Sequence, residues 1–140
     1  MSNLIFPVKN GYVTHGFDED RNGKPHGGYD IGSKTQPAYI VACCDCKIYA
    51  AGWSDSDKTK SFGLRIWLEP LDKELKKKYP FIVYGHMEKI NVLSGKIIKE
   101  GDIVGIMGNT GASKGVHLHA EARNLPSVKG KSIRILEFES

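Results

Sequence analysis

The sequence predicts a mainly antiparallel β domain. Three observations favour it: short apolar or alternating segments recur along the 140 residues, turn residues separate them, and sustained helical periodicity is absent. The 16 glycines and 6 prolines fit a fold with many tight turns. This length suffices for one hydrophobic core, so we expect residues 1–140 to form a single domain with few short helices.

The first quarter of the chain contains a histidine and an aspartate that could meet. Residues 1–25 are punctuated by glycine and proline and are expected to be loop-like, apart from a short strand at 12–14. His26 and Asp30 follow, and two of the three residues between them are glycine. Glycine lets the backbone turn tightly, so both side chains could reach one point.

The middle of the chain is expected to form strands joined by polar loops. Segments with the apolar content of strands cover residues 38–43, 47–52, 62–68, 81–85 and 103–107. Asp45 marks a turn between the first two segments. Residues 71–78 form a charged insert that could make one or two helical turns, and an apolar patch at 133–136 follows near the end.

Three cysteines lie together, at Cys43, Cys44 and Cys46. The odd count excludes a complete set of disulfides, and no second Cys or His pair follows at zinc-finger spacing. We therefore interpret them as structural thiols in a strand and its turn, in a protein from a reducing compartment.

The segment 117–123 is expected to be a strand with functional side chains on one face. Alternate side chains of a strand point to the same side, so His117 and His119 share a face with Glu121 and Arg123. The three residues between them are apolar and small enough to pack against a core. Imidazole is both the commonest metal ligand in proteins and a common general base near neutral pH.

Four of the five histidines lie at predicted strand ends or beside glycines, where side chains can line a cleft. His26, Asp30 and His119 offer two nitrogens and one oxygen. A catalytic zinc site uses three protein ligands and keeps a fourth position open. His86 and His117 would remain close by as groups able to handle protons.

These motifs resemble the M23 family of zinc metallopeptidases, the lysostaphin and LytM type. His26 with Asp30 matches the family's His-x-x-x-Asp motif, His117 with His119 matches its His-x-His motif, and His86 matches its isolated histidine after Tyr-Gly. Flanking residues match as well, at 31–32, 50–53, 100–105 and 108–111. The similarity covers about residues 6–123, and three separated motifs in the right order make it specific.

The resemblance implies an antiparallel sheet with a groove across it, built as the duplicated hybrid motif of LytM-like domains. It implies one Zn²⁺ ion per chain, held by His26, Asp30 and His119, with catalysis assisted by His86 and His117. It also implies that the substrate is bacterial peptidoglycan, cut in its peptide stems or cross-bridges. We expect a monomer that acts on this polymer, with neither nucleic acid nor a membrane as a partner.

Two further residues have a possible place in the site. His15 stands where the family more often has a small polar residue, and it could line the groove. Glu121 could support a ligand histidine from behind, or it could equally be a solvated surface carboxylate. Zinc would activate water and polarise the scissile carbonyl, and the sequence does not divide the proton-transfer roles between His86 and His117.

Two other functions stay open at this stage. A catalytically silent LytM-like module could bind the cell wall or a partner, although the presence of all five motif residues argues against it. A non-catalytic carrier is a weaker alternative. Residues 100–108 resemble the hairpin of biotinyl and lipoyl domains, but no lysine occupies a tight turn beside a methionine.

Composition and the N-terminal residues bear on location. The net charge of +4 gives mild attraction to polyanions and does not distinguish nucleic acid from an anionic cell wall. Residues 1–20 lack the pattern of a signal peptide, and no apolar run is long enough to span a membrane. We therefore expect synthesis in the cytoplasm and action on the wall after release, as by a bacteriophage endolysin, or carriage on a virion.

Overall fold

The computed structural model describes residues 3–18, 20–21 and 24–139, and it confirms a mainly antiparallel β fold. Within these residues the larger sheet has eight strands and the smaller sheet has three. In order across the larger sheet, the strands are β1 (Gly11–His15), β4 (Tyr29–Ser33), β12 (Leu118–Arg123), β8 (Phe81–Gly85), β7 (Leu64–Pro70), β6 (Cys46–Trp53) and β10 (Ile97–Ile98), and β13 (Ser132–Ile133) pairs with β12.

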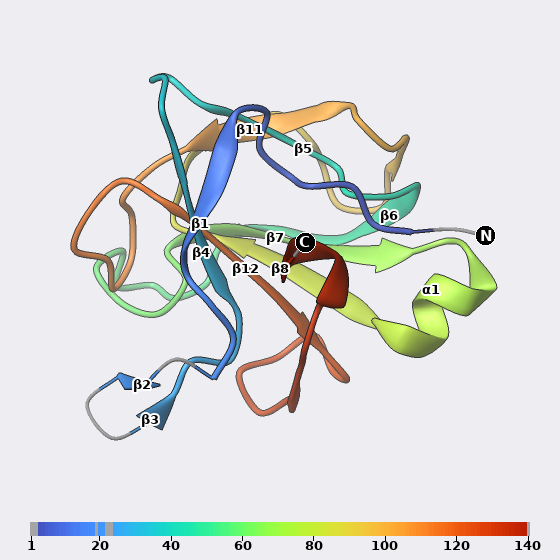
Figure 1. Ribbon diagram of the computed structural model, residues 1–140. Helices are drawn as coiled ribbons and strands as arrows, with labels where there is room; N and C mark the ends of the chain where they lie inside the picture. The colour runs from blue at the N-terminus through green and yellow to red at the C-terminus, as the bar shows by residue number, and fades with distance from the viewer. Residues whose placement is uncertain (1–2, 19, 22–23, 140) are drawn as a thin grey trace.

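The smaller sheet lies over the larger one, as the positions of β5 and β11 show (Figure 1). Its strand order is β5 (Tyr39–Val41), β11 (Ile103–Met107) and β9 (Met87–Ile90). A short hairpin of β2 (Asp20–Arg21) and β3 (Lys24–Pro25) stands apart, and a 3-10 helix, η1 (Leu136–Glu139), comes near the end of the chain.

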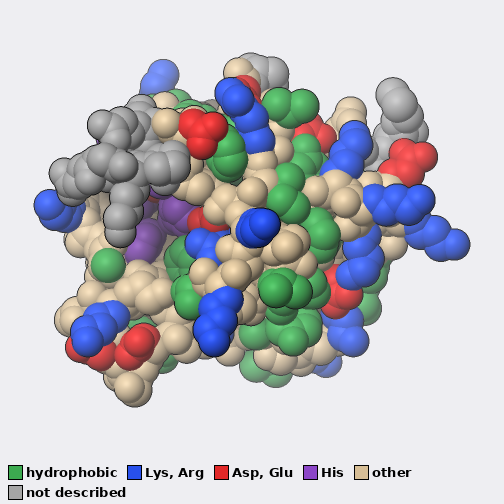
Figure 2. All heavy atoms as spheres, turned by 90° about the horizontal axis from the view of Figure 1, so that it is seen from below, with side chains coloured by type: hydrophobic (Ala, Val, Ile, Leu, Met, Phe, Trp, Pro, Cys, Tyr) green, Lys and Arg blue, Asp and Glu red, His purple; other side chains and the backbone are tan. Residues whose placement is uncertain are grey.

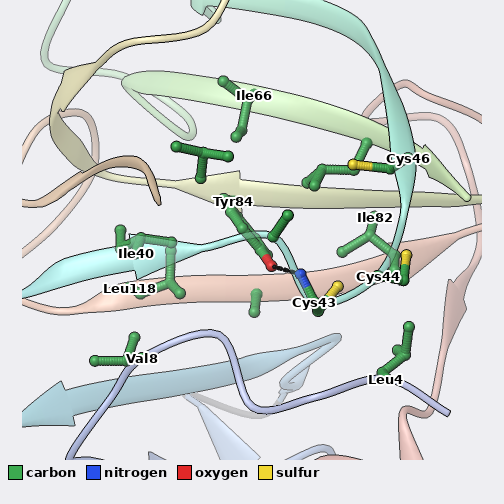
Figure 3. Close-up of a cluster of buried hydrophobic side chains, with 14 of the residues drawn as sticks. Leu4, Val8, Ile40, Cys43, Cys44, Cys46, Ile66, Ile82, Tyr84 and Leu118 are labelled. Atoms are coloured by element: carbon green, nitrogen blue, oxygen red, sulfur yellow. Dashed lines mark hydrogen bonds between the residues drawn. The ribbon is translucent and has the colours of Figure 1, made fainter. Parts of the chain in front are cut away.

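The core joins the two sheets through buried aliphatic side chains. Ile40, Ile82 and Leu118 come from β5, β8 and β12, and each is 0 % exposed; they converge on one cluster (Figure 3). Tyr84 of β8 adds a polar tie, because its hydroxyl donates to the Val41 carbonyl at 2.9 Å and accepts from the Cys43 N–H at 3.0 Å. This tie fixes the segment around β5 against the larger sheet.

The three cysteines lie in this core, as expected for structural thiols. Cys43, Cys44 and Cys46 are buried, and none of them forms a disulfide. Burial raises the pKa of the Cys46 thiol to about 12, so this group is neutral at ordinary pH.

The register of the larger sheet brings the motif residues into a row. His119 in β12 is paired with Asp30 in β4 on one side and with Gly85 in β8 on the other. Asp30 is paired in turn with His15 in β1, and His86 follows directly after Gly85. Paired residues of neighbouring strands lie about 5 Å apart, so four adjacent strands present these side chains to one place.

Strand pairing and strand bounds differ from the sequence-based expectations in several places. β8 and β11 have the expected bounds, but the segments on either side of Asp45 belong to different sheets, because β5 pairs with β11 and β6 pairs with β7. β5 is also shorter than expected, since the Ala42 N–H bonds outside the regular ladder, to the Asp102 carbonyl. β4 was not expected as a strand, because its flanking glycines favour a turn.

The charged insert forms α1 (Lys73–Lys78), a short helix that extends the β7–β8 hairpin. The Asp72 side chain caps it by accepting from the N–H groups of Glu74 and Leu75, both at 3.1 Å. Leu75 packs into the core. α1 lies at the far end of the molecule from the β2–β3 hairpin (Figure 1). Among the helices of the described residues, none has the length and apolar character needed to cross a membrane.

Candidate metal centre

A groove with a volume of about 950 Å³ opens over the row of motif residues. The five histidines all line it: His15, His26, His86, His117 and His119. Figure 2 shows imidazoles gathered in a hollow of this face. None of the residues of the charged insert at 71–78 is part of the lining.

Three side chains direct ligand atoms towards one point. His26, Asp30 and His119 each offer one ligand atom, and these atoms all lie within 4.8 Å of one another. Asp30 Oδ1 lies 3.4 Å from His26 Nε2 and 3.2 Å from His119 Nδ1. Two imidazole nitrogens and one carboxylate oxygen are a donor set that zinc prefers.

Hydrogen bonds on the outer side of both histidines decide which nitrogen faces this point. His26 Nδ1 lies 3.1 Å from the Gly16 carbonyl oxygen, which can only accept, so Nδ1 carries the proton and Nε2 keeps its lone pair. His26 Nε2 is buried and finds no hydrogen-bond partner within the described part of the chain. A buried acceptor beside a carboxylate is costly unless a cation completes the site, so these residues fit a metal ion.

Glu121 holds the outer side of His119. Its Oε1 lies 2.8 Å from His119 Nε2, and its other oxygen accepts from Arg123 Nε and from the Ser132 hydroxyl. Glu121 is 2 % exposed, so it is a buried partner of the histidine and not a solvated surface group. Burial opposes its charge, but the hydrogen bonds from His119, Arg123 and Ser132 outweigh burial and lower its pKa.

The electrostatics of the cluster favour an anionic aspartate. Burial opposes the charge of Asp30, yet the hydrogen bond from His119 and the close approach of the His26 ring hold its pKa well below the ordinary value. Burial likewise opposes a charged His119, and the bonds to Asp30 and Glu121 outweigh it and raise the pKa of His119. A proton and a metal ion therefore compete for His119 Nδ1.

His86 closes one side of the groove, between β8 and β9. Its Nδ1 lies 2.7 Å from the Thr110 carbonyl oxygen, so Nδ1 is the protonated nitrogen and Nε2 is the acceptor. Burial lowers the pKa of His86 to about 4, and the ring is neutral at pH 7. His86 can therefore accept a proton in the range where peptide hydrolases work.

His117 lies beside His86, with ring centroids 4.9 Å apart. Its Nδ1 lies 2.8 Å from the Gly115 carbonyl oxygen, and its Nε2 lies 3.5 Å from Asp30 Oδ1. Both of these histidines thus offer Nε2 as the unprotonated nitrogen, as the orientation of a general base requires.

His15 reaches the outer edge of the same cluster. Its Nδ1 lies 3.6 Å from Asp30 Oδ2, and its side chain is 48 % exposed. The structure therefore places His15 on the groove wall, on the opposite oxygen of Asp30 from the two candidate ligand histidines.

Sequence reasoning assigned no role to three residues that shape the site. Phe62 packs against His119, with ring centroids 5.6 Å apart, and the Arg123 guanidinium lies 5.6 Å from the Phe62 ring centroid. The Thr110 carbonyl accepts a hydrogen bond from His86 Nδ1. The alternation of the 117–123 strand placed Arg123 on the correct face, but no local signal connects Phe62 or Thr110 with histidines far along the chain.

The fold therefore has a candidate metal centre, which lies in a groove across an antiparallel sheet. The family model of peptidase family M23 matches residues 24–134, which is most of the chain. The chain therefore belongs to peptidase family M23, and the resemblance expected from its motifs is confirmed.

Curated relatives and solved structures agree with this family. Glycyl-glycine endopeptidase ALE-1 of Staphylococcus capitis is 31 % identical over 111 residues, 79 % of this chain and 28 % of that protein. Lysostaphin of Staphylococcus simulans is 32 % identical over 111 residues, again 79 % of this chain and 20 % of that protein. The chain thus spans less than a third of the length of each of these relatives.

The fold matches solved peptidases over most of its length. The catalytic domain of the antimicrobial peptidase lysostaphin has a TM-score of 0.65 at 29 % identity, covering 89 % of this chain and 88 % of that chain. A mutant catalytic domain of the prophage-encoded M23 protein EnpA from Enterococcus faecalis has a TM-score of 0.75. It covers 99 % of this chain and 98 % of that one at 22 % identity, which concerns the fold alone.

Proposed function

We propose that the protein is a zinc-dependent endopeptidase that hydrolyses peptide bonds in bacterial peptidoglycan. The observation that carries this proposal is the convergence of His26, Asp30 and His119, whose ligand atoms lie within 4.8 Å of one another. Both histidines are held from behind by hydrogen-bond acceptors, so their free nitrogens are oriented before a metal arrives.

The residues of the site have two roles in this proposal, as metal ligands and as groups that transfer protons. His26 Nε2, Asp30 Oδ1 and His119 Nδ1 would bind one zinc ion, which when bound polarises a peptide carbonyl and lowers the pKa of water. Glu121 orients His119. His86 and His117 present Nε2 on the other side of the groove, where an unprotonated nitrogen can take a proton from water and return it to the leaving amine.

The relatives and the groove support the proposed substrate class. Two relatives bear the names glycyl-glycine endopeptidase and lysostaphin, and both match this chain over 111 residues. The groove, with a volume of about 950 Å³, lies over the row of histidines. We place the reaction at the cell wall, reached after release from the cytoplasm or on a virion, and this location is part of the proposal.

Metal analysis and wall digestion test the proposal together. We expect about one zinc per purified chain, and we expect His119→Ala and Asp30→Ala to lose it, while Asp57→Ala, at an exposed loop position, retains it. Mass spectrometry of digested peptidoglycan should reveal new amine and carboxylate ends. New reducing sugars would contradict a peptidase, and wall binding without any cleavage would favour the silent module.

A further inference from the structure

His86 adopts a backbone conformation that its own strands do not explain. Its φ is 61°, in the left-handed region that side chains other than glycine rarely adopt, so surrounding contacts must enforce it. One contact is the His86 N–H, which donates to the Phe62 carbonyl at 2.6 Å. The other is the His86 ring, whose Nδ1 lies 2.7 Å from the Thr110 carbonyl oxygen. Both acceptors lie outside the two strands that flank His86.

The Thr110 side chain ties these contacts together. Its hydroxyl donates to the Met87 carbonyl at 2.8 Å and accepts from the Leu64 N–H at 3.0 Å. Met87 directly follows His86, and Leu64 lies two residues after Phe62. One hydroxyl thus binds the backbone directly after His86 and also the backbone two residues after Phe62, whose carbonyl accepts from the His86 N–H. Both bonds depend on the hydroxyl, which can donate one hydrogen bond and accept another at the same time.

Two glycines allow Thr110 to come this close. A Cβ atom on Gly63 would lie 2.5 Å from the Thr110 carbonyl carbon, and a Cβ atom on Gly111 would lie 2.4 Å from the Gly63 nitrogen. Both glycines have positive φ, +66° and +75°. The Ala112 N–H also donates to the Ser61 carbonyl at 2.9 Å. The two loops therefore pack backbone against backbone, and Thr110 lies at their junction.

We propose that Thr110 is the positioning residue of His86. Its hydroxyl fixes the backbone at residue 110, so that the Thr110 carbonyl accepts a hydrogen bond from His86 Nδ1. His86 Nε2 then stays unprotonated and faces the groove. During hydrolysis Nε2 takes a proton from the attacking water, and the imidazolium gives that proton to the leaving nitrogen. This catalytic consequence rests on the proposed function. The assignment of the His86 tautomer is independent of the proposed function.

Nitrogen NMR tests the tautomer directly. Long-range ¹⁵N–¹H correlation at pH 7 distinguishes a protonated from an unprotonated ring nitrogen, and His86→Ala identifies the signals of His86. We expect wild type and Thr110→Ser to show only the Nδ1-protonated ring, and Thr110→Val to show a mixture of both forms. A wild-type His86 protonated on Nε2 overturns the proposal without any variant at Thr110.

Kinetics of peptide cleavage supply the second readout. Thr110→Val keeps the shape of threonine and loses both bonds, so we expect kcat to fall about tenfold or more, with KM within about twofold and zinc content unchanged. Thr110→Ser should restore kcat to within about threefold. Thr59→Val is the matched control, because Thr59 is exposed and its hydroxyl donates to Asp57.

The possible outcomes are distinct. Equal kcat in Thr110→Val and wild type overturns the proposal, and so does an equal loss in Thr110→Ser and Thr110→Val. Loss of zinc from Thr110→Val also overturns it, because the effect would then be on the metal site. If Thr110→Val does not fold, the wild-type tautomer and Thr110→Ser kinetics still decide. Absence of cleavage by wild type refutes the proposed function and leaves the NMR result as the test of Thr110.

Discussion

Glu121 Oε1 lies 2.8 Å from His119 Nε2, and the two residues are neighbours on the same face of one strand. The contact is possible because β12 places alternate side chains side by side and because Arg123 and Ser132 hold the second carboxylate oxygen. The carboxylate can only accept, so this bond requires a proton on Nε2 and turns Nδ1 towards Asp30.

Removing this carboxylate should weaken metal binding. We expect Glu121→Ala to lower zinc affinity about 10- to 100-fold, the usual effect of losing a hydrogen-bond partner behind a ligand. Competition with a chromogenic chelator measures the affinity. Glu88→Ala, at an exposed position, is the control and should bind zinc as wild type does. Equal affinity in Glu121→Ala and wild type would show that His119 is oriented by other contacts.

His86 and His117 should matter for the rate of cleavage and not for the metal content. Because neither His86 nor His117 belongs to the cluster of converging ligand atoms, His86→Ala and His117→Ala should keep about one zinc per chain. Loss of a general acid or base should lower kcat about 100-fold or more. Single-turnover cleavage of a defined wall peptide measures the rate, and near-normal cleavage by either variant removes that histidine from the mechanism.

Stability of the zinc-free protein should depend on pH through His86. Burial lowers the pKa of His86 to about 4 from an ordinary 6.5, so between these values the unfolded chain binds a proton that the folded chain does not. The free energy of unfolding should therefore fall as pH falls from 6.5 to 4. Urea titrations at several pH values measure this dependence. The slope of the free energy of unfolding against pH should be up to about 1.4 kcal/mol per pH unit smaller in His86→Ala than in wild type. Identical slopes would contradict a buried neutral ring.

The three thiols should be unreactive in the folded protein. Cys43, Cys44 and Cys46 are all buried, so a reagent cannot reach them in the folded protein, and burial also raises the pKa of Cys46 to about 12. A thiol-labelling reagent should react with three groups per chain only in denaturant. Rapid labelling of any cysteine under native conditions would show that this part of the core opens.

The turn between the first two motif residues should tolerate no side chain at Gly28. A Cβ atom there would lie 2.7 Å from the Ala120 carbonyl oxygen and 2.7 Å from Glu121 Cβ, so β4 and β12 would have to separate. We expect Gly28→Ala to cost about 1–3 kcal/mol in the free energy of unfolding, as overpacking does. Gly16→Ala is the control, because a Cβ atom at Gly16 meets no atom within 4 Å.

Local patterns predicted much of the fold and of the candidate site. A five-residue apolar segment gave β8 with its bounds, and alternation along the 117–123 strand placed His119 with Glu121 on one face and their neighbours in the core. Such patterns work because a strand's side chains alternate whatever the strand pairs with. The sequence therefore identifies which residues could share a site even before the pairing is known.

What the sequence did not predict depends on contacts between distant segments. Whether Glu121 is buried or solvated is decided by Ser132 and Arg123 closing over it. The left-handed backbone of His86 is decided by Phe62 and Thr110, which lie 24 residues away from it on either side. The separation of the strands around Asp45 into two sheets is likewise a property of their partners and not of their composition.

The position of α1 has a practical consequence for engineering. The helix caps the end of β8 opposite to His86, and none of its residues lines the groove. Its anchors are a capping aspartate, one buried leucine and the ion pair of Lys76 with Glu69, so the exposed Lys73, Lys77 and Lys78 carry little of the fold. A fluorophore, affinity tag or cell-targeting module could be grafted at this tip, about the length of a five-residue strand from the histidines, without obstructing the path of a polymer through the groove.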